Sequence, residues 1–361
     1  MKRPTAVVGA GVVGLAVARA LALRGQDVVV LESADRIGTG VTSRSSEVIH
    51  AGLYYPPGSL KGRTCVRGRE LLYAYAAERG VPHRQTGKLI VATDPSQVDA
   101  LSALRDNARR SGAGELLWLT PEAVRDREPQ VRCVAGLWSE RSGIVDSHAL
   151  CEALATDLQD AGGAVVLRTH ARRVDPVAGI LRVHTDDHVL ACDQVVLANG
   201  LDGRRLAATC LPVPPAPTKL AKGSYMALSG CPAPFRHLVY PLPEAGGLGI
   251  HATVDLAGRV RFGPDVEWVD GEDYTPSADV DRFEAAVRRY WPDLPDGCLS
   301  PAYAGIRPKL VGPGEPAADF RILGPAEHGT PGLTALLGIE SPGLTAALAL
   351  AELVAARTPR S

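Results

Sequence analysis

Short apolar runs separated by polar and glycine-rich stretches predict an α/β protein. The first run, Thr5 to Val8, and the second, Val28 to Leu31, each have a length suited to a buried strand. The chain between them opens on closely spaced glycines and suits a helix. We therefore expect the chain to begin with a strand, a tight turn, a helix and a second strand.

The same pattern predicts helices and strands further along. Apolar positions on one side of a stretch predict helices over residues 62–79 and 277–290. A polar helical stretch covers 97–111, a closing helix is expected over 342–356, and Asp146 or Ser147 can cap another helix that ends at 162–163. Apolar or alternating runs predict strands over residues 87–92, 164–167, 194–200, 223–227, 237–241, 248–253, 259–263 and 332–339. A hairpin-like region follows Arg172.

The distribution of these elements predicts two domains. Prolines between residues 211 and 217 mark an exit from the first domain, and alternating strands then dominate. A strand and a helix near the end return to the pattern of the beginning. We expect a discontinuous first domain of residues 1–84, 145–212 and 316–361, with an inserted mixed-sheet α+β domain of residues 85–144 and 213–315.

Composition narrows the class of protein. With 361 residues, 45% hydrophobic and 22% charged, the chain has the balance of a soluble globular protein. The net charge of −1 and the absence of a basic block argue against nucleic acid as a partner. We expect no transmembrane segment and no signal peptide. The seven scattered cysteines suit reduced thiols, so we expect a cytoplasmic protein, and the nine histidines lack metal-ligand spacing, so we expect no metal.

The glycine-rich turn after the first strand predicts a dinucleotide site. Gly9 permits the turn, Gly11 lets the backbone approach a pyrophosphate, and Gly14 allows the helix to pack closely on the strand. Val13 lies at the start of the helix, where free amides favour negative charge. Glu32 ends the second strand and can accept hydrogen bonds from two ribose hydroxyls while it repels a 2′-phosphate.

Two further features favour FAD over NAD as this dinucleotide. Residues 39–55 are rich in hydroxyls and small side chains, which suit a phosphate and a ribityl chain. The helix that begins near Pro342 can point its dipole at a group that becomes anionic, as reduced flavin does. The candidate contacts in the first of these segments are Thr42, Ser43, Arg44 and Ser45.

Motifs spread over nearly the whole chain carry a family resemblance. They are residues 43–55 with 57–61, 143–146, 240–241, 248–251, 262–264, 305–308 and 340–345. In this order they resemble the D-amino-acid oxidase superfamily of FAD-dependent oxidoreductases, specifically its L-2-hydroxyglutarate dehydrogenase/oxidase-like proteins. The resemblance implies a Rossmann-like, glutathione-reductase-like FAD-binding domain packed against a sheet-based substrate domain, with the flavin between them.

The resemblance also implies further cofactor contacts. Val174 lies where an edge strand commonly meets adenine, and Asn199 with Gly200 resembles the turn beside the dinucleotide. The closing motif resembles the segment at the pyrimidine end of the flavin, and its candidate contacts are Ser341, Gly343, Leu344 and Thr345.

Oxidation of a 2-hydroxy acid needs a base for the hydroxyl proton and an anchor for the carboxylate. Histidine suits the base, and His50 and His251 both lie in apolar segments, although a buried histidine can equally be structural. Arg307 suits the anchor because a guanidinium can hold a carboxylate through two charge-assisted bonds; its alternative role is an interdomain salt bridge.

Other polar residues are weaker candidates for contact with the substrate. Tyr240 and Lys222 can bond the substrate or its distal carboxylate, and Tyr54 and Tyr55 can cover the flavin. For each tyrosine, packing is the competing interpretation.

Three functions follow from these residues. The first is FAD-dependent oxidation of a small 2-hydroxy acid, foremost L-2-hydroxyglutarate to 2-oxoglutarate, with dioxygen and a quinone both open as electron acceptor. The second is oxidation of a glycine-like or N-methyl amino acid, which would use the same carboxylate anchor. The third is flavin binding without turnover.

Overall fold

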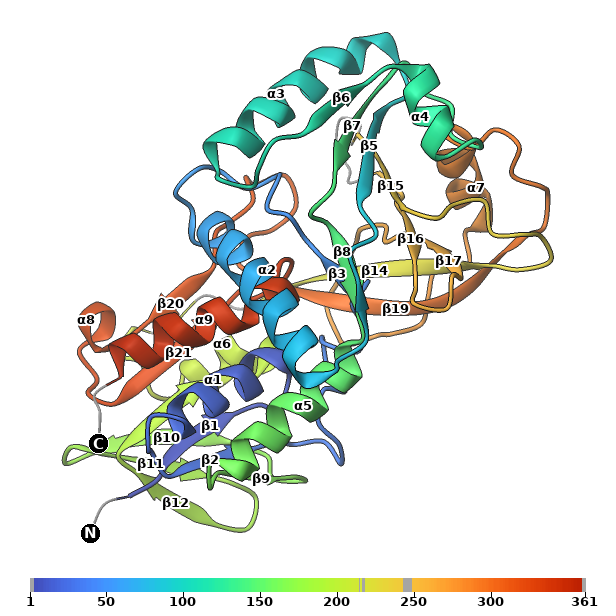
Figure 1. Cartoon of the computed structure of the whole chain (residues 1–361). Coiled ribbons are helices and arrows are strands. Elements are labelled where there is room, and N and C mark those ends of the chain that lie inside the picture. Colours follow the sequence, from blue (N-terminus) through green and yellow to red (C-terminus); the bar gives the residue numbers. More distant parts are fainter. Residues whose placement is uncertain (1–2, 214, 216–217, 243–248, 359–361) are drawn as a thin grey trace.

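Two large β-sheets organise the chain (Figure 1), whose computed structural model describes residues 3–213, 215, 218–242 and 249–358. Within these residues the first sheet has six strands. In spatial order they are β20 (Arg321–Leu323), β21 (Leu333–Leu337), β13 (Gln194–Leu197), β1 (Thr5–Val8), β2 (Val28–Leu31) and β9 (Ala164–Val166). All neighbours are parallel except β20 and β21.

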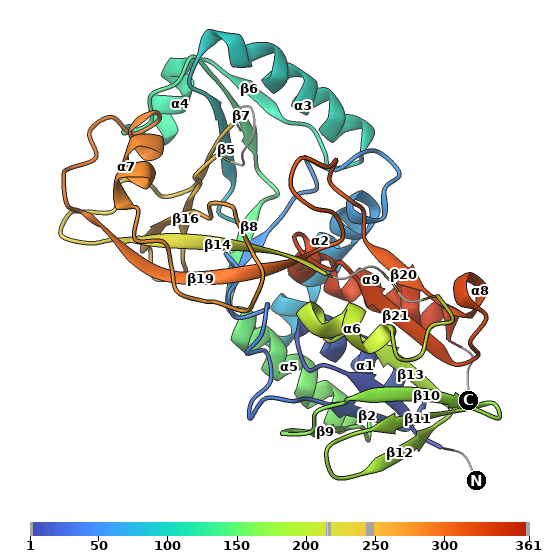
Figure 2. The same ribbon diagram turned by 180° about the vertical axis from the view of Figure 1, so that it is seen from behind.

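Both faces of this sheet are covered, which explains why its inner strands are apolar throughout. One face packs against α1 (Val12–Ala22), α2 (Leu60–Arg79), α5 (Ser147–Asp160) and α9 (Gly343–Arg357). The other face carries α6 (Gly203–Ala207) and a small sheet of β10 (Arg173–Val177), β11 (Ile180–His184) and β12 (Val189–Cys192), which Figure 2 shows from behind.

The second large sheet forms the upper part of the molecule in Figure 1. Its spatial order is β18 (Glu267–Val269), β14 (Lys219–Leu228), β17 (Val260–Phe262), β16 (Ala252–Val254), β15 (Leu238–Pro241), β5 (Lys88–Ala92), β7 (Ala135–Ser139) and β6 (Leu117–Leu119), and β19 (Leu299–Lys309) pairs with β14. Helices α3 (Val98–Arg110), α4 (Pro121–Arg127) and α7 (Val280–Arg288) pack on it. Strands β14 and β19 run from this sheet toward the first one.

A second small sheet and several short helices complete the described fold. Strand β8 (Gly143–Val145) pairs with β3 (Val48–Ile49) and β4 (His83–Arg84). The remaining short helices are η1 (Pro95–Gln97), η2 (Gly200–Asp202) and α8 (Pro325–His328).

The expected fold class is confirmed, and sheet membership follows the expected alternation along the chain. The division into two domains at the stated boundaries stays a prediction. Residues 214, 216 and 217 of the proline-dense segment lie outside the described residues.

Some element boundaries differ from expectation. The strand expected over 248–253 begins only at Ala252, so His251 precedes it, and Leu248 lies outside the described residues. Arg307 lies within β19 rather than in a strand-to-loop transition. Helix α7 begins at Val280 because the Asp279 side chain caps it. The elements that were not predicted include strands β3, β4, β6 to β8, β18 and β20 and helices α4, α6 and α8.

Candidate active site

The turn between β1 and α1 brings two backbone segments into very close contact. A Cβ added at Gly14 would lie 1.9 Å from the carbonyl oxygen of Gly9, and one at Gly9 would lie 2.7 Å from the carbonyl oxygen of Ala198. Gly9 also has a φ of 102°, a conformation that favours glycine. Only glycine therefore allows α1 to start directly against the end of the strand.

Glu32 braces this turn from the end of β2. One carboxylate oxygen accepts the Ala10 amide at 2.6 Å and the other accepts the Ala34 amide at 2.9 Å. The carboxylate also lines the adjoining cavity. Its remaining lone pairs can accept hydroxyl donors from a bound molecule.

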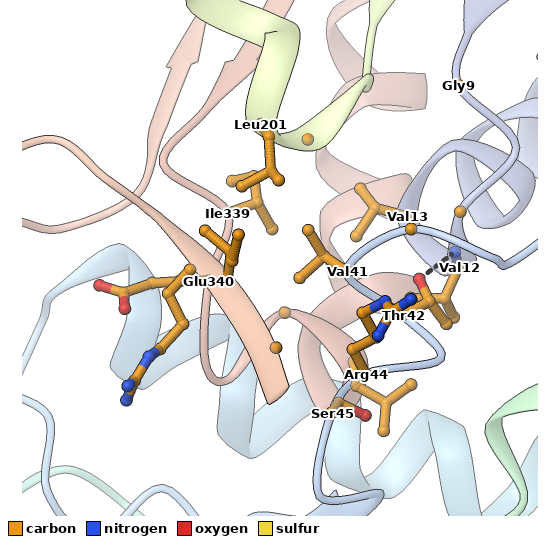
Figure 3. Close-up of a pocket in the computed structure, with 18 of the residues that line it drawn as sticks. Gly9, Val12, Val13, Val41, Thr42, Arg44, Ser45, Leu201, Ile339 and Glu340 are labelled. Atoms are coloured by element: carbon orange, nitrogen blue, oxygen red, sulfur yellow. Dashed lines mark hydrogen bonds between the residues drawn. The ribbon is translucent and has the colours of Figure 1, made fainter. Parts of the chain in front are cut away.

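A cavity of about 780 Å³ extends from this turn to the second sheet, a size within the range of cofactor and ligand sites. Figure 3 shows Val13, Val41, Leu201 and Ile339 pointing toward one another across it. Thr42 lies at the start of α1, where its hydroxyl accepts the Val12 amide at 3.1 Å. The cavity thus joins an apolar middle to a helix N-terminus.

Asn199 marks a polar wall of the same cavity. Its side-chain nitrogen donates to Asp202 at 3.5 Å, and its buried side-chain oxygen has no hydrogen-bond partner among the described residues. Gly200 lies beside it in the cavity lining. Because protein atoms cover this oxygen, Asn199 lines the cavity through its other atoms.

Arg44 joins the two layers over the cavity. Its guanidinium lies 4.0 Å from the centre of the Tyr274 ring and donates to the Ala304 carbonyl at 3.3 Å. A Cβ at Gly305 would lie 2.4 Å from the Arg44 carbonyl oxygen, so β19 passes directly against this segment. Ser45 lines the cavity next to Arg44.

Arg307 lines the end of the cavity formed by the second sheet. Its Nε donates to the Ala221 carbonyl at 3.3 Å, and its Nη2 donates to the carbonyls of Lys222 at 3.2 Å and Asp265 at 2.7 Å. Within the described residues Nη1 has no hydrogen bond, and no carboxylate pairs with the group. The arrangement fixes a cation that is left able to bind an anion.

Both candidate histidines line the cavity near Arg307. His50 lies just after β3, where its amide donates to Thr345 at 3.0 Å and its Nε2 lies 3.3 Å from the Ser341 hydroxyl. His251 stacks on Tyr240, with ring centres 3.6 Å apart and planes 12° apart. The structure therefore brings His50, His251, Tyr240 and Arg307 to one end of one cavity.

The environment favours the neutral form of both histidines. Burial lowers the pKa of His50 well below its usual value, and the charges of Lys88 and His251 lower it further. Burial, then Lys88 and Arg307, lower the pKa of His251 to about 3. A neutral imidazole can accept a proton, so either ring can serve as a base.

Comparison with known proteins identifies the family. Residues 5–357 match the family model described as DAO, FAD dependent oxidoreductase. The chain belongs to this family. FAD is accordingly the dinucleotide, and the chain is an FAD-dependent oxidoreductase.

Sequence relatives agree with this assignment. The chain is 44% identical over 399 residues to the mitochondrial L-2-hydroxyglutarate dehydrogenase of Arabidopsis thaliana, an alignment that covers 97% of this chain and 82% of the plant protein. It is 31% identical over 275 residues to the mitochondrial L-2-hydroxyglutarate dehydrogenase of Homo sapiens, covering 72% of this chain and 59% of the human protein.

Solved structures share the fold. L-alpha-glycerophosphate oxidase of Mycoplasma pneumoniae with FAD bound has a TM-score of 0.88 at 23% identity, covering 98% of this chain and 93% of that one. Glycine oxidase of Geobacillus kaustophilus has a TM-score of 0.83 at 22% identity, covering 99% and 95%. At these identities the likeness concerns the fold alone.

The cavity fits FAD. The free amides at the start of α1, beside Gly11, suit the pyrophosphate, and Glu32 suits the ribose. Ser341, Gly343 and Leu344 line the cavity at the start of α9 and suit the flavin end. Among the described residues no helix is long and apolar enough to cross a membrane, and no cluster of three or more histidine, cysteine, aspartate or glutamate side chains could hold a metal ion.

Several predicted FAD contacts do not line the cavity. Ser43 is exposed, and its hydroxyl donates to the carbonyls of Thr39 and Gly40 within its own turn. Gly14 serves the helix–strand contact only. Thr345 is buried; its hydroxyl accepts the His50 amide and donates to Val48, so it fastens α9 to β3.

Two more predicted contacts have other surroundings in the structure and stay predictions. Val174 is fully buried in β10 and donates its amide to Thr209, whereas Ala171, three residues earlier, lines the cavity. Lys222 pairs with Glu267 at 3.1 Å and Asp273 at 3.3 Å and does not line the cavity, so it is not available to a substrate carboxylate. Tyr54 and Tyr55 are also absent from the lining of this cavity.

Sequence reasoning missed two charged residues, one in the lining of the cavity and one just behind it. Glu340, 8% exposed, pairs with Lys61 at 2.9 Å and with Lys309 at 2.7 Å. Lys88, 1% exposed, opens an otherwise apolar strand. A lysine at a fully buried strand position was the one sequence signal that could have identified the second of them.

Proposed function

We propose that this chain oxidises a short 2-hydroxy acid, foremost L-2-hydroxyglutarate, to the corresponding 2-oxo acid. The proposal is supported by the 44% identity over 97% of the chain to a plant protein named for this reaction. The solved structures named for amino-acid or glycerophosphate oxidation are similar in fold only, so they give no comparable support to the amine alternative.

One observation carries the proposal at the level of chemistry. A carboxylate anchor, Arg307, and two neutral imidazoles, His50 and His251, line the same end of the cavity that begins at the FAD turn. An alcohol needs a base to remove its proton, which a neutral amine does not need to the same extent. This combination favours a hydroxy acid as substrate.

Each residue of the site has a separate role in the proposed reaction. Arg307, held by three backbone carbonyls, binds the carboxylate beside the reacting carbon through its free Nη1. One of the two histidines takes the hydroxyl proton as the C2–O bond becomes a carbonyl. Bound FAD supplies the hydride acceptor. The apolar side chains around the cavity exclude water from the reacting groups.

We also propose that the protein works in a reducing compartment such as the cytoplasm, because all seven cysteines are free. The plant and human relatives are named as mitochondrial proteins.

A turnover assay tests the proposed reaction. The FAD-loaded protein is supplied with a dye as electron acceptor and, in turn, L-2-hydroxyglutarate, L-lactate, glycine and sarcosine, and the 2-oxo acid and ammonia or amine products are quantified. The proposal predicts formation of 2-oxoglutarate at a rate well above that of any other product. Release of ammonia or methylamine without 2-oxoglutarate would replace it with the amine reaction.

A further inference from the structure

Lys88 is a buried cation behind the candidate base. Only 1% of the residue is exposed, and its ammonium lies 3.9 Å from the centre of the Tyr240 ring and 5.9 Å from that of Tyr54. Within the described residues the ammonium makes no hydrogen bond or ion pair. Buried lysines are rare without a partner, so this position requires an explanation.

The register of the sheet explains why Lys88 meets Tyr240. In the parallel pair of β5 and β15, Lys88 lies opposite Leu238. Tyr240 is two residues further along β15, and side chains two residues apart in a strand point to the same face. Lys88 and Tyr240 therefore share one face of the sheet.

Lys88, Tyr240 and His251 form a column. The Tyr240 ring lies between the ammonium and the imidazole, with ring centres of Tyr240 and His251 3.6 Å apart. Tyr240 and His251 line the cavity, and Lys88 does not. Because an ammonium is attracted to the face of an aromatic ring, Lys88 can hold this ring against the histidine from behind.

The other groups around the two histidines do not neutralise this charge. They are Arg307 on β19, Cys65 on α2, Tyr225 on β14, and Tyr54 in the loop after β3. None of them is a carboxylate, and burial raises the pKa values of Cys65, Tyr54 and Tyr225, which keeps these three groups neutral. Glu340, next to Ser341, is already paired with Lys61 and Lys309.

We propose that Lys88 is a positioning residue for the oxidation: its ammonium orients the Tyr240–His251 stack and keeps His50 and His251 in the deprotonated form that can accept a proton. The inference rests on the proposed function insofar as that function requires a base. Lys88 is the largest contributor after burial to the lowered pKa of both histidines. Burial lowers the pKa of Lys88 itself to about 7, so it is charged at the acidic pH values where a histidine would otherwise protonate.

Replacement of Lys88 by methionine tests the role of its charge in the FAD-loaded enzyme. Loss of a like charge raises the histidine pKa values, so the acid limb of the rate of flavin reduction by L-2-hydroxyglutarate should move to higher pH by roughly one unit. At pH 8.5 the wild-type Lys88, whose pKa is about 7, is mostly uncharged, so the rates of Lys88→Met and wild type should there lie within about threefold of each other. Lys88→Arg, which keeps the charge, should retain the wild-type acid limb. Lys222→Met also removes a buried cation, but that cation is paired outside the cavity. In this variant the acid limb should lie at the same pH as in the wild type.

A second readout does not depend on turnover. In protein carrying ¹³C-labelled histidine, the resonances of His50 and His251 are assigned with His50→Gln and His251→Gln and followed against pH. Their midpoints should rise by roughly one unit in Lys88→Met and not in Lys222→Met. If no hydroxy acid reduces the wild-type flavin, the proposed function fails, and this titration still tests Lys88.

Three results would overturn the inference. One is coincidence of the wild-type and Lys88→Met midpoints. Another is a shift in Lys88→Arg equal to that in Lys88→Met, since the first variant keeps the charge. The third is loss of the folded or FAD-bound state in Lys88→Met, which would make Lys88 a residue of the fold; methionine matches the buried stem and removes a buried charge, so we expect a folded protein.

Discussion

At the scale of single residues, Arg307 combines fixed geometry with a free hydrogen-bond donor. Three backbone carbonyls hold Nε and Nη2, and lysine cannot reproduce this fork. We expect Arg307→Lys to lower kcat/KM for the hydroxy acid about 10- to 150-fold, the loss of a charged hydrogen bond of about 1.5–3 kcal/mol, mainly through KM. Steady-state kinetics measure the change. An unaltered KM would show that the carboxylate binds elsewhere.

The two histidines make a prediction about pH. Because their pKa values are lowered, the rings stay neutral as the pH falls through 6.5, where an ordinary histidine is half protonated. We expect the rate of flavin reduction to stay level from pH 8 down to about 6. A half-loss centred near pH 6.5 would contradict the neutral-base account.

Replacement of each histidine decides which one is the base. His50→Gln or His251→Gln should lower the rate of flavin reduction by about 10²- to 10⁴-fold, the range for loss of a general base, and the other should lower it much less. Rapid-mixing measurements at pH 7.5 distinguish them. Full rates in both variants would exclude both residues.

Residue type and neighbourhood were enough to select Arg307 and both histidines for the cavity, but not to orient every side chain. Ser43 lies in the expected hydroxyl-rich segment, yet its hydroxyl bonds to its own turn. Lys222 has the expected charge, yet it forms ion pairs with Glu267 and Asp273. Such competing partners come from distant parts of the chain and leave no local pattern.

At the scale of elements, the β1–α1 turn depends on the absence of a side chain at Gly14. A Cβ there would lie 1.9 Å from the Gly9 oxygen, so Gly14→Ala must displace α1. We expect a loss of about 1–3 kcal/mol in the free energy of unfolding and weaker FAD binding. Gly271→Ala is the matched control, since a Cβ there meets no atom within 4 Å, and its effect should stay within about 0.5 kcal/mol. Urea unfolding and FAD titration give both quantities, and equal effects would refute the steric argument.

Glu340 joins three elements at the cavity. It bonds Lys61 of α2 and Lys309 of β19 from the segment that leads into α9. Glu340→Gln leaves two cations without their shared acid, so we expect a loss of about 3 kcal/mol in the free energy of unfolding. Glu352→Gln, which breaks an exposed pair with Arg67, should cost at most about 1 kcal/mol. Comparable losses in both variants would show that burial of Glu340 is unimportant.

Periodicity predicted most elements because long apolar patterns are local. Helix α2 was expected from residue 62 and begins at Leu60, with Ser59 as its cap. Strand β16 was misplaced because glycines and short apolar residues around His251 read as strand, although the hydrogen-bonded run starts at Ala252. The strands β6 and β7 were missed because, at three and five residues, each is too short to show a clear period.

At the scale of the whole molecule, the cavity runs from the glycine turn after β1 of the first sheet to Arg307 and His251 beside the second sheet. The glycine turn and Glu32 at its FAD end could be predicted from sequence because both lie within the first 32 residues. Its substrate end is assembled from β14, β15, β19 and the segment before β16. Lys88 of β5 lies behind this end and is recognised only once β5 and β15 are paired. Function at this scale depends on one end of the cavity binding FAD and the other end binding the substrate.

The central claim is that bound FAD is reduced by a 2-hydroxy acid at this cavity, and anaerobic mixing tests it most directly. The FAD-loaded protein is mixed separately with L-2-hydroxyglutarate, its D-enantiomer, glycine and sarcosine, and the absorbance of oxidised flavin is followed. The account predicts rapid bleaching by the L-hydroxy acid and none by the other three. Bleaching by an amino acid alone, or no bleaching by L-2-hydroxyglutarate, would contradict it.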